Sequence, residues 1–114
     1  MVITKSFDIR FYRKTSGKEP VLEWIKEFSE KDQKIIGHDI KRIQYTWPLT
    51  MPLVKALGSG LMEMRIKLKD TQIRIFFTLH EGAIILLHGF VKKTQKTPPN
   101  EMEIAVKRLK QIKR

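Results

Sequence analysis

Residues 61–69 read Leu61-Met62-Glu63-Met64-Arg65-Ile66-Lys67-Leu68-Lys69, and from Met62 onward apolar and polar side chains alternate without a break. Successive side chains of a β-strand point to opposite faces of the sheet. The segment therefore predicts a strand with one apolar face and one charged face. Three of the four side chains on the charged face are basic, whereas an ordinary solvated sheet face mixes the two signs.

The next two segments extend this strand into a three-stranded antiparallel meander. Asp70-Thr71 is a plausible turn, and residues 72–80 alternate again, with Arg74 and Phe76 on one face. Glu81-Gly82 predicts a tight hairpin turn. Residues 83–91 are almost continuously apolar, which is typical of a strand buried on both faces.

The chain before and after the meander supplies one more strand and three helices. Residues 5–12 alternate as a half-buried strand. Helical periodicity follows from Pro20 to Phe28 and again up to Trp47, with Ser29 as the expected N-cap of the second helix. Residues 48–60 are predicted to form a connection that ends in Gly58-Ser59-Gly60. A last helix is expected to begin near Pro98 or Asn100, with Asn100 and Glu103 as a capping box.

These elements predict a single α+β domain over residues 1–114, in the order β-α-α-β-β-β-α. The chain has no cysteine, which excludes disulfides and thiolate chemistry, and its three histidines show no metal-ligand spacing. No apolar run approaches the roughly 20 residues that span a bilayer, and the N-terminus does not read as a signal peptide. We therefore expect a cytoplasmic protein without a metal or another cofactor.

Charge is the strongest functional signal in the composition. The chain has 23 basic and 12 acidic residues, a formal net charge of +11. Between Arg65 and Pro98 only Asp70 and Glu81 oppose the basic residues, which are Arg65, Lys67, Lys69, Arg74, Lys92, Lys93 and Lys96. Such a surplus favours a polyphosphate partner, because neutralised phosphates release counterions. A basic surface that serves solubility, or a strongly acidic protein partner, would also fit.

The polar face of the meander could support RNA cleavage, in which a 2′-hydroxyl attacks the adjacent phosphate. Arginine and lysine can stabilise the transition state and protonate the leaving oxygen without metal. Glu63 and His88 are candidates for the proton acceptor, as is a lysine whose pKa is lowered by neighbouring cations. His88 can equally be a structural sheet histidine. Phe76 and Phe90 either stack on a base or pack beneath a helix or loop.

Residues 84–101 resemble the signature of the phage-derived HigB-like toxins of the RelE/ParE superfamily, in the order Ile84-Ile85-Leu86-Leu87-His88-Gly89-Phe90-Val91-Lys92-Lys93-Thr94-Gln95-Lys96-Thr97-Pro98-Pro99-Asn100-Glu101. Ala105 and two upstream stretches, residues 60–65 and 74–77, also match that group. The resemblance covers nearly the whole chain, and the superfamily has the same β-α-α-β-β-β-α order.

The resemblance implies the toxin of a type II toxin–antitoxin pair, and RelE-like members are metal-independent endoribonucleases that cut messenger RNA in the ribosomal A site. By position, Arg65 and Lys67 resemble the family's basic pair and Arg74 its charge-stabilising arginine. Lys92 and Lys93 fall where RelE has a Lys-Arg pair. RelE carries a tyrosine near the start of its C-terminal segment, and residues 99–103 of this chain have none. The His and acidic trio near the C-terminus of the type HigB enzyme is also lacking. The proton acceptor therefore stays unassigned.

The prediction is therefore a ribosome-dependent mRNA interferase. Its catalytic residues are expected to be Arg65, Arg74, Lys92, Lys93 and Glu63, and its RNA-contacting residues Lys67, Lys69, Phe90, Lys96 and His88. The resemblance implies a HigA-like helix-turn-helix antitoxin as partner, with operator DNA bound only through that antitoxin. Two alternatives stay open, a ParE-like toxin that poisons DNA gyrase and a non-catalytic basic nucleic-acid-binding module.

Overall fold

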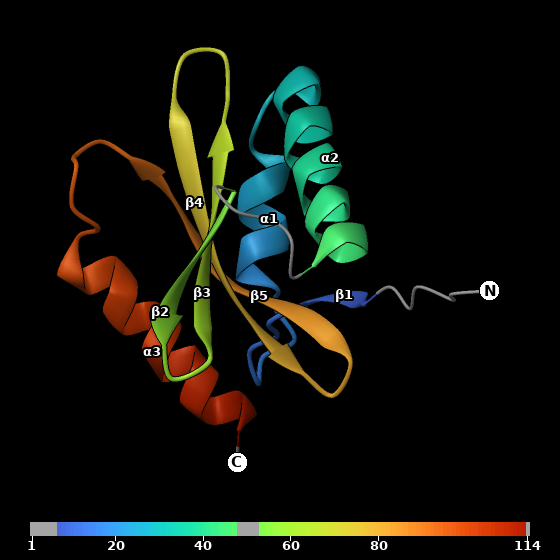
Figure 1. Cartoon of the computed structure of the whole chain (residues 1–114), viewed down its shortest axis with the longest axis vertical. Coiled ribbons are helices and arrows are strands. Elements are labelled where there is room, and N and C mark those ends of the chain that lie inside the picture. Colours follow the sequence, from blue (N-terminus) through green and yellow to red (C-terminus); the bar gives the residue numbers. More distant parts are fainter. Residues whose placement is uncertain (1–6, 48–52, 114) are drawn as a thin grey trace.

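The computed structural model describes residues 7–47 and 53–113, and it contains a five-stranded mixed sheet with helices on both faces (Figure 1). The strand order across the sheet is β1-β5-β4-β3-β2. Strand β1 runs parallel to β5, and the other neighbours are antiparallel. In chain order the elements are β1 (Asp8–Phe11), α1 (Pro20–Lys26), α2 (Glu30–Thr46), β2 (Val54–Gly58), β3 (Leu61–Lys67), β4 (Gln72–His80), β5 (Ala83–Lys92) and α3 (Pro99–Ile112).

Helices α1 and α2 cover one face of the sheet. They lie side by side, joined by three residues, and contribute Val21, Ile25, Ile36, Ile40 and Ile43 to the larger hydrophobic core (Figure 1). The strands contribute their apolar side chains to the same core, including Met64, Ile66, Ile73, Ile75 and Phe77. Each fully buried side chain of this size contributes about 1.5–3 kcal/mol, and the cluster on this face is the larger of the two formed by the described residues.

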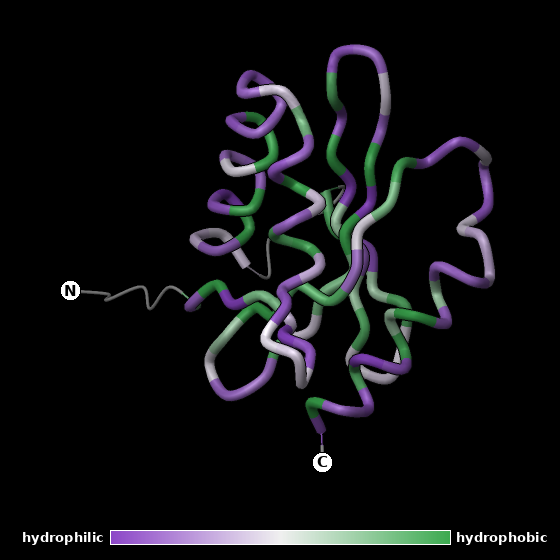
Figure 2. Tube along the Cα trace, turned by 180° about the vertical axis from the view of Figure 1, so that it is seen from behind, coloured by the Kyte–Doolittle hydropathy of each residue, from purple (hydrophilic) through white to green (hydrophobic). Residues whose placement is uncertain are grey.

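Helix α3 covers part of the opposite face. Its buried residues Ala105 and Leu109 pack with Leu61, Phe76 and the second set of β5 side chains. The tip of the β3–β4 hairpin is hydrophilic (Figure 2) and lies far from α3 (Figure 1). On the α3 face, the end of the sheet near this tip is therefore left for polar side chains, whereas its other face still carries buried Ile66, Leu68 and Ile73.

Several local predictions are confirmed. The α+β class and the antiparallel meander are present, and β5 is buried on both faces over residues 83–87. Ser29 caps α2, because its hydroxyl oxygen accepts the Asp32 backbone N–H at 3.1 Å. Glu81 and Gly82 both have positive φ, as a two-residue hairpin turn requires.

Two local predictions are wrong. The stretch predicted as a connection over residues 48–60 contains strand β2, which pairs with β3 along the edge of the sheet; residues 48–52 lie outside the described residues. The capping box of Asn100 and Glu103 does not form. Helix α3 begins instead at Pro99, whose missing N–H costs nothing there, and the Pro98 carbonyl accepts the N–H groups of Glu101 and Met102. No helix within residues 7–47 and 53–113 is both long and apolar enough to cross a bilayer.

Candidate nucleic-acid interface

Basic side chains of three strands meet in two adjacent rows at one end of the sheet. Arg65 of β3 lies opposite Arg74 of β4, and Lys67 occupies the next row on the same face. Lys92 of β5 joins the row of Lys67 through Gln72, which pairs with both. The alternation in the sequence thus translates into a two-dimensional cluster of cations.

A β-bulge in β5 decides which side chains of that strand face this cluster. Phe76 pairs with His88 and Phe77 pairs with Leu86, so Leu87 has no partner of its own. The extra residue reverses the alternation of β5. As a result Phe90 and Lys92 lie on the α3 face with Arg74, whereas Gly89 faces Trp24 of α1.

Glu63 is the buried counterion of the two arginines. It is 2% exposed, and its Oε1 lies 3.7 Å from Nε of Arg65 and 3.7 Å from Nε of Arg74. Its other oxygen, Oε2, accepts a hydrogen bond from the Thr97 hydroxyl at 3.1 Å. Like charges opposite one another on neighbouring strands repel. Glu63 offsets this repulsion and ties both guanidinium groups to the loop that precedes α3.

Arg74 is the more constrained of the two arginines, with a side chain 10% exposed against 40% for Arg65. Its Nη1 donates to the Ile73 carbonyl at 3.2 Å and its Nη2 donates to the Gln72 side-chain oxygen at 3.3 Å. The Nε atoms of both arginines are buried without a hydrogen-bond partner. Glu63 therefore neutralises them by its charge at 3.7 Å and not through a short hydrogen bond.

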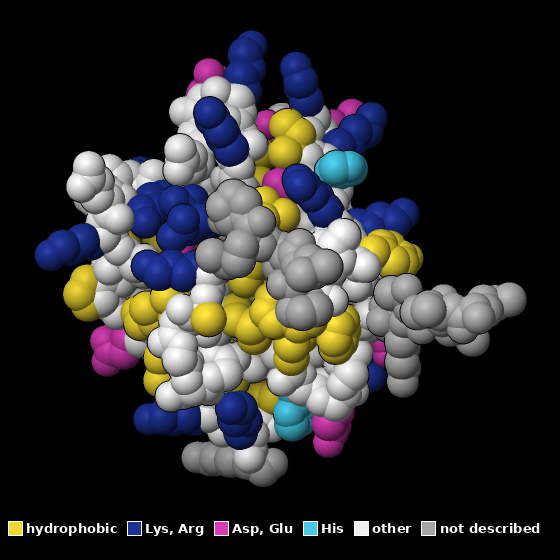
Figure 3. All heavy atoms as spheres, viewed as in Figure 1, with side chains coloured by type: hydrophobic (Ala, Val, Ile, Leu, Met, Phe, Trp, Pro, Cys, Tyr) yellow, Lys and Arg dark blue, Asp and Glu magenta, His cyan; other side chains and the backbone are white. Residues whose placement is uncertain are grey.

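These side chains line an open cavity of about 590 Å³, which we call the cationic hollow and which is formed by Arg65, Gln72, Arg74, Lys92, Lys93, Thr94 and Gln95. All seven lining side chains are polar, and four of them are cations. Figure 3 shows Lys and Arg side chains gathered between the β3–β4 hairpin and the loop before α3. Such a lining suits a ribose–phosphate backbone better than an apolar ligand.

Lys92 has an altered acidity inside the hollow. Burial lowers the pKa of its ammonium, and the positive charges of Arg74, Arg65 and Lys55 lower the pKa further, against an opposing effect of Glu63. A lowered pKa raises the fraction of neutral amine near neutral pH. Lys92 is thereby a candidate proton acceptor within the hollow.

The remaining basic candidates do not line the hollow. Lys67 is exposed beside it on β3, Lys69 is exposed at the tip of the β3–β4 hairpin, and Lys96 is exposed in the loop before α3. Lys55 was missed by the sequence reasoning. It lies opposite Glu63 on β2, the strand that the sequence reasoning did not predict.

Phe90 and Phe76 form part of the core and are not a platform for bases. Phe76 is fully buried and Phe90 is 5% exposed, and their rings stack with centroids 5.6 Å apart. The packing alternative is therefore the correct one for both. Phe90 has too little exposed ring to stack on a base, contrary to the expectation that it contacts RNA.

His88 is held beneath α3 and does not line the hollow. Its side chain is 16% exposed, and its Nε2 lies 3.0 Å from Oε1 of Glu101. Arg108 donates to the Leu87 carbonyl at 2.7 Å and lies 3.5 Å from Nδ1 of His88. Because an arginine only donates, this arrangement fits a neutral imidazole whose Nε2–H donates to Glu101. Burial lowers the pKa of His88, with Glu101 opposing and Arg108 adding to the effect.

These observations define the class of the protein: a small basic α+β protein with a cationic hollow at one end of a mixed sheet. The model of the phage-derived Gp49-like protein family (DUF891) matches residues 23–110. The chain belongs to this family, which is a HigB-like family of RelE/ParE toxins. No curated protein matches the chain.

Proposed function

We propose that this chain is the toxin of a toxin–antitoxin pair and a ribosome-dependent endoribonuclease that cuts messenger RNA. The observation that carries the proposal is the cationic hollow, which brings Arg65, Arg74, Lys92 and Lys93 together on an all-polar lining. Membership of the Gp49-like family supports a toxin of the HigB type. An antitoxin partner, of the HigA-like helix-turn-helix class, belongs to the same proposal.

In the proposed reaction, the 2′-hydroxyl of one nucleotide attacks the adjacent phosphate and its proton passes to the neutral amine of Lys92. Arg65 and Arg74 stabilise the additional negative charge of the phosphorane-like transition state. The bond to the 5′-oxygen breaks, and Lys93 donates a proton to that leaving oxygen. The products are a 2′,3′-cyclic phosphate and a 5′-hydroxyl, and no other reactant is consumed.

Glu63 has a different role in this proposal from the one expected from the sequence. Its carboxylate is 2% exposed and is occupied by two arginines and Thr97, so it does not reach a 2′-hydroxyl. It acts as a positioning residue that holds Arg65 and Arg74. The exposed Lys67, Lys69 and Lys96 contact the RNA backbone on either side of the scissile link.

The proposal includes the ribosome because the described residues of the hollow offer neither a free histidine nor a free carboxylate as proton acceptor. His88 and Glu63 are both engaged in contacts within the protein, which leaves a lysine as proton acceptor. At its ordinary pKa of about 10.4 a lysine is almost wholly protonated at neutral pH, whereas histidine at about 6.5 is largely neutral, so less of a lysine is available to accept a proton. The ribosome would then supply the bent RNA geometry that brings the 2′-hydroxyl into line.

The experiment is controlled expression of the chain in bacteria, followed by primer extension on a reporter transcript and by gel analysis of plasmid supercoiling. We expect translation to stop and transcripts to be cut within codons, with supercoiling unchanged. Arg74→Ala should slow cleavage by about 10²–10³-fold, whereas Arg42→Ala, which alters an exposed arginine on α2, should cut as the wild type does. Intact transcripts with relaxed plasmid or DNA breaks would favour the gyrase-poisoning class, and unaffected growth the binding module.

A further inference from the structure

A second cationic cavity, of about 840 Å³, lies between α3 and the end of β1, away from the hollow. We call it the α3–β1 groove. Its lining comes from residues 10–15, from Ile85 of β5 and from one flank of α3, namely Ile104, Lys107, Arg108, Gln111 and Ile112. It shares no lining residue with the cationic hollow.

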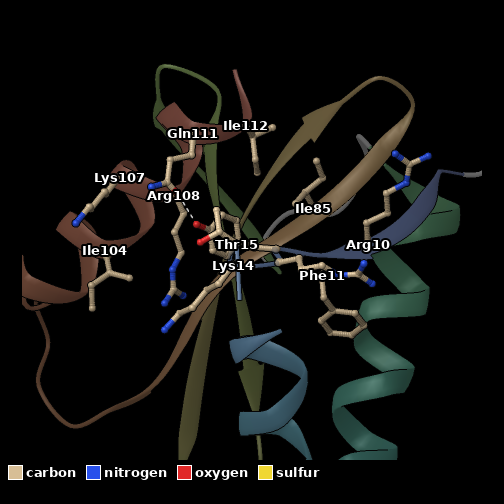
Figure 4. Close-up of a pocket in the computed structure, with 12 residues that line it drawn as sticks. Arg10, Phe11, Lys14, Thr15, Ile85, Ile104, Lys107, Arg108, Gln111 and Ile112 are labelled. Carbon is tan, nitrogen blue, oxygen red and sulfur yellow. Dashed lines mark hydrogen bonds between the residues drawn. The ribbon is translucent and has the colours of Figure 1, made fainter. Parts of the chain in front are cut away.

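The rim of the groove is strongly positive. It carries Arg10, Arg13, Lys14, Lys107 and Arg108, and none of its lining residues is acidic. In Figure 4 the heads of Lys14, Lys107 and Arg108 gather on one side, and Arg10 lies at the far end. Arg10 and Arg13 have carboxylates 3.9 and 3.6 Å away, but both arginine side chains are more than half exposed, so these pairs carry little energetic weight.

The floor of the groove distinguishes it from the cationic hollow. Ile85, Ile104 and Ile112 supply aliphatic surface, whereas the hollow has only polar side chains; the Phe11 ring packs into the core on the α1/α2 face and turns away from the groove (Figure 4). Ile104 is half-buried but packs against neither of the two hydrophobic clusters formed by the described residues. An aliphatic floor gives nothing to a phosphodiester chain, but it lowers the free energy of binding an apolar side chain.

The walls of the groove are fixed before any ligand arrives. Arg108 donates to the Leu87 carbonyl at 2.7 Å and lies 5.2 Å from the centre of the Tyr12 ring. The Tyr12 hydroxyl in turn donates to the Gln111 side-chain oxygen, which joins the segment after β1 to α3. A preorganised groove binds at a lower entropic cost than one that must form around its ligand.

We propose that the α3–β1 groove is a docking site for an acidic, amphipathic protein segment, whose apolar side chains lie on the isoleucine floor while its carboxylates face the basic rim. The charge of the rim and the apolar chemistry of the floor together select this occupant over RNA. The site is distinct from the hollow of the proposed nuclease and does not depend on it.

The test measures binding of three fluorescent 15-residue peptides by anisotropy. In the first, leucines recur at i, i+3, i+4 and i+7 among glutamates; the second has the same composition with the leucines dispersed around the helix; the third is polyglutamate. We expect the first to bind about ten-fold more tightly than polyglutamate, a difference of roughly 1.4 kcal/mol. Equal affinity for all three, or no binding of the first, would overturn the proposal.

Variants and mapping locate the binding. Lys14→Glu with Lys107→Glu should weaken the first peptide about ten-fold or more. Lys34→Glu with Lys41→Glu changes the net charge equally on the exposed face of α2 and should not weaken it. Amide shifts caused by the peptide should appear in residues 10–15 and 104–111, and shifts confined to residues 65–74 and 92–95 would contradict the site. A single-stranded RNA that loses affinity in the Lys14/Lys107 variant while the peptide does not would show the groove to be an RNA contact.

Discussion

At the scale of single residues, the cationic hollow depends on one buried carboxylate. Alternation in the sequence places Glu63 on the same face as Arg65, and the structure confirms that placement. The sequence does not reveal that Glu63 is buried, because part of its environment comes from Thr97, more than thirty residues further along the chain. A side chain that reads as a candidate base is therefore an anchor for the two arginines.

Glu63→Gln should lower the free energy of unfolding by about 3 kcal/mol, because it leaves two neighbouring guanidinium groups without their counterion. Urea denaturation at neutral pH measures the change. Glu103→Gln, at an exposed position of α3, is the control and should stay within about 0.5 kcal/mol of the wild type. A Glu63→Gln protein of unchanged stability would show that the arginines do not need this carboxylate.

His88 should make stability depend on pH. Its pKa in the folded protein is lowered from 6.5, chiefly by burial, so the unfolded chain takes up the proton first as the pH falls. The stability associated with neutral His88 is present above pH 6.5 and is lost as the pH falls through the folded-state pKa.

The measurement compares the free energy of unfolding at pH 7.5 and pH 5.5 in the wild type, in His88→Asn and in His38→Asn. His38 has a side chain 78% exposed and is the control. The loss of stability on acidification should be smaller in His88→Asn and unchanged in His38→Asn. If all three lose the same amount, burial of His88 does not control its protonation.

At the scale of elements, the bulge in β5 and the edge strand β2 are the features that the sequence did not predict. The apolar run over residues 83–91 has no alternation, so it carries no signal for the reversal at Leu87. The edge strand β2 is five residues long, and the Gly58-Ser59-Gly60 turn reads as part of a loop. In contrast, the alternation around Arg65 in β3 and around Arg74 in β4 was sufficient to predict the faces of these two side chains.

Gly89→Ala should destabilise the protein by about 1–3 kcal/mol, because a Cβ there would lie 2.3 Å from Cζ3 of Trp24 and the helix α1 would have to move. Thermal or urea denaturation measures the effect. Gly37→Ala is the matched control, since it lies within α2 with no atom inside 4 Å and should stabilise by up to about 1 kcal/mol. Equal stability of the two variants would mean that β5 and α1 are not packed closely at Gly89.

At the scale of the whole molecule, the helices decide which parts of the sheet are covered and where the two cationic cavities lie. Helices α1 and α2 close one face of the sheet, α3 closes part of the other, and the end of the sheet beyond α3 is left to the cationic hollow. The α3–β1 groove lies between α3 and the end of β1 and shares no lining residue with the hollow. The net charge of +11 indicated a polyanionic partner. The two cationic cavities differ in the side chains beside the charges, which are all polar in the hollow and include isoleucines in the groove, and the composition of the chain carries no information on this difference.

The most direct test of the central claim uses purified chain, ribosomes stalled on a defined messenger RNA, and analysis of the RNA ends. We predict fragments that carry a 2′,3′-cyclic phosphate upstream of the cut and a 5′-hydroxyl downstream, formed only when ribosomes are present. Arg74→Ala should slow this cleavage by about 10²–10³-fold, the effect of removing one stabiliser of transition-state charge. Messenger RNA that stays intact, or that is cut equally fast by Arg74→Ala, would contradict the account.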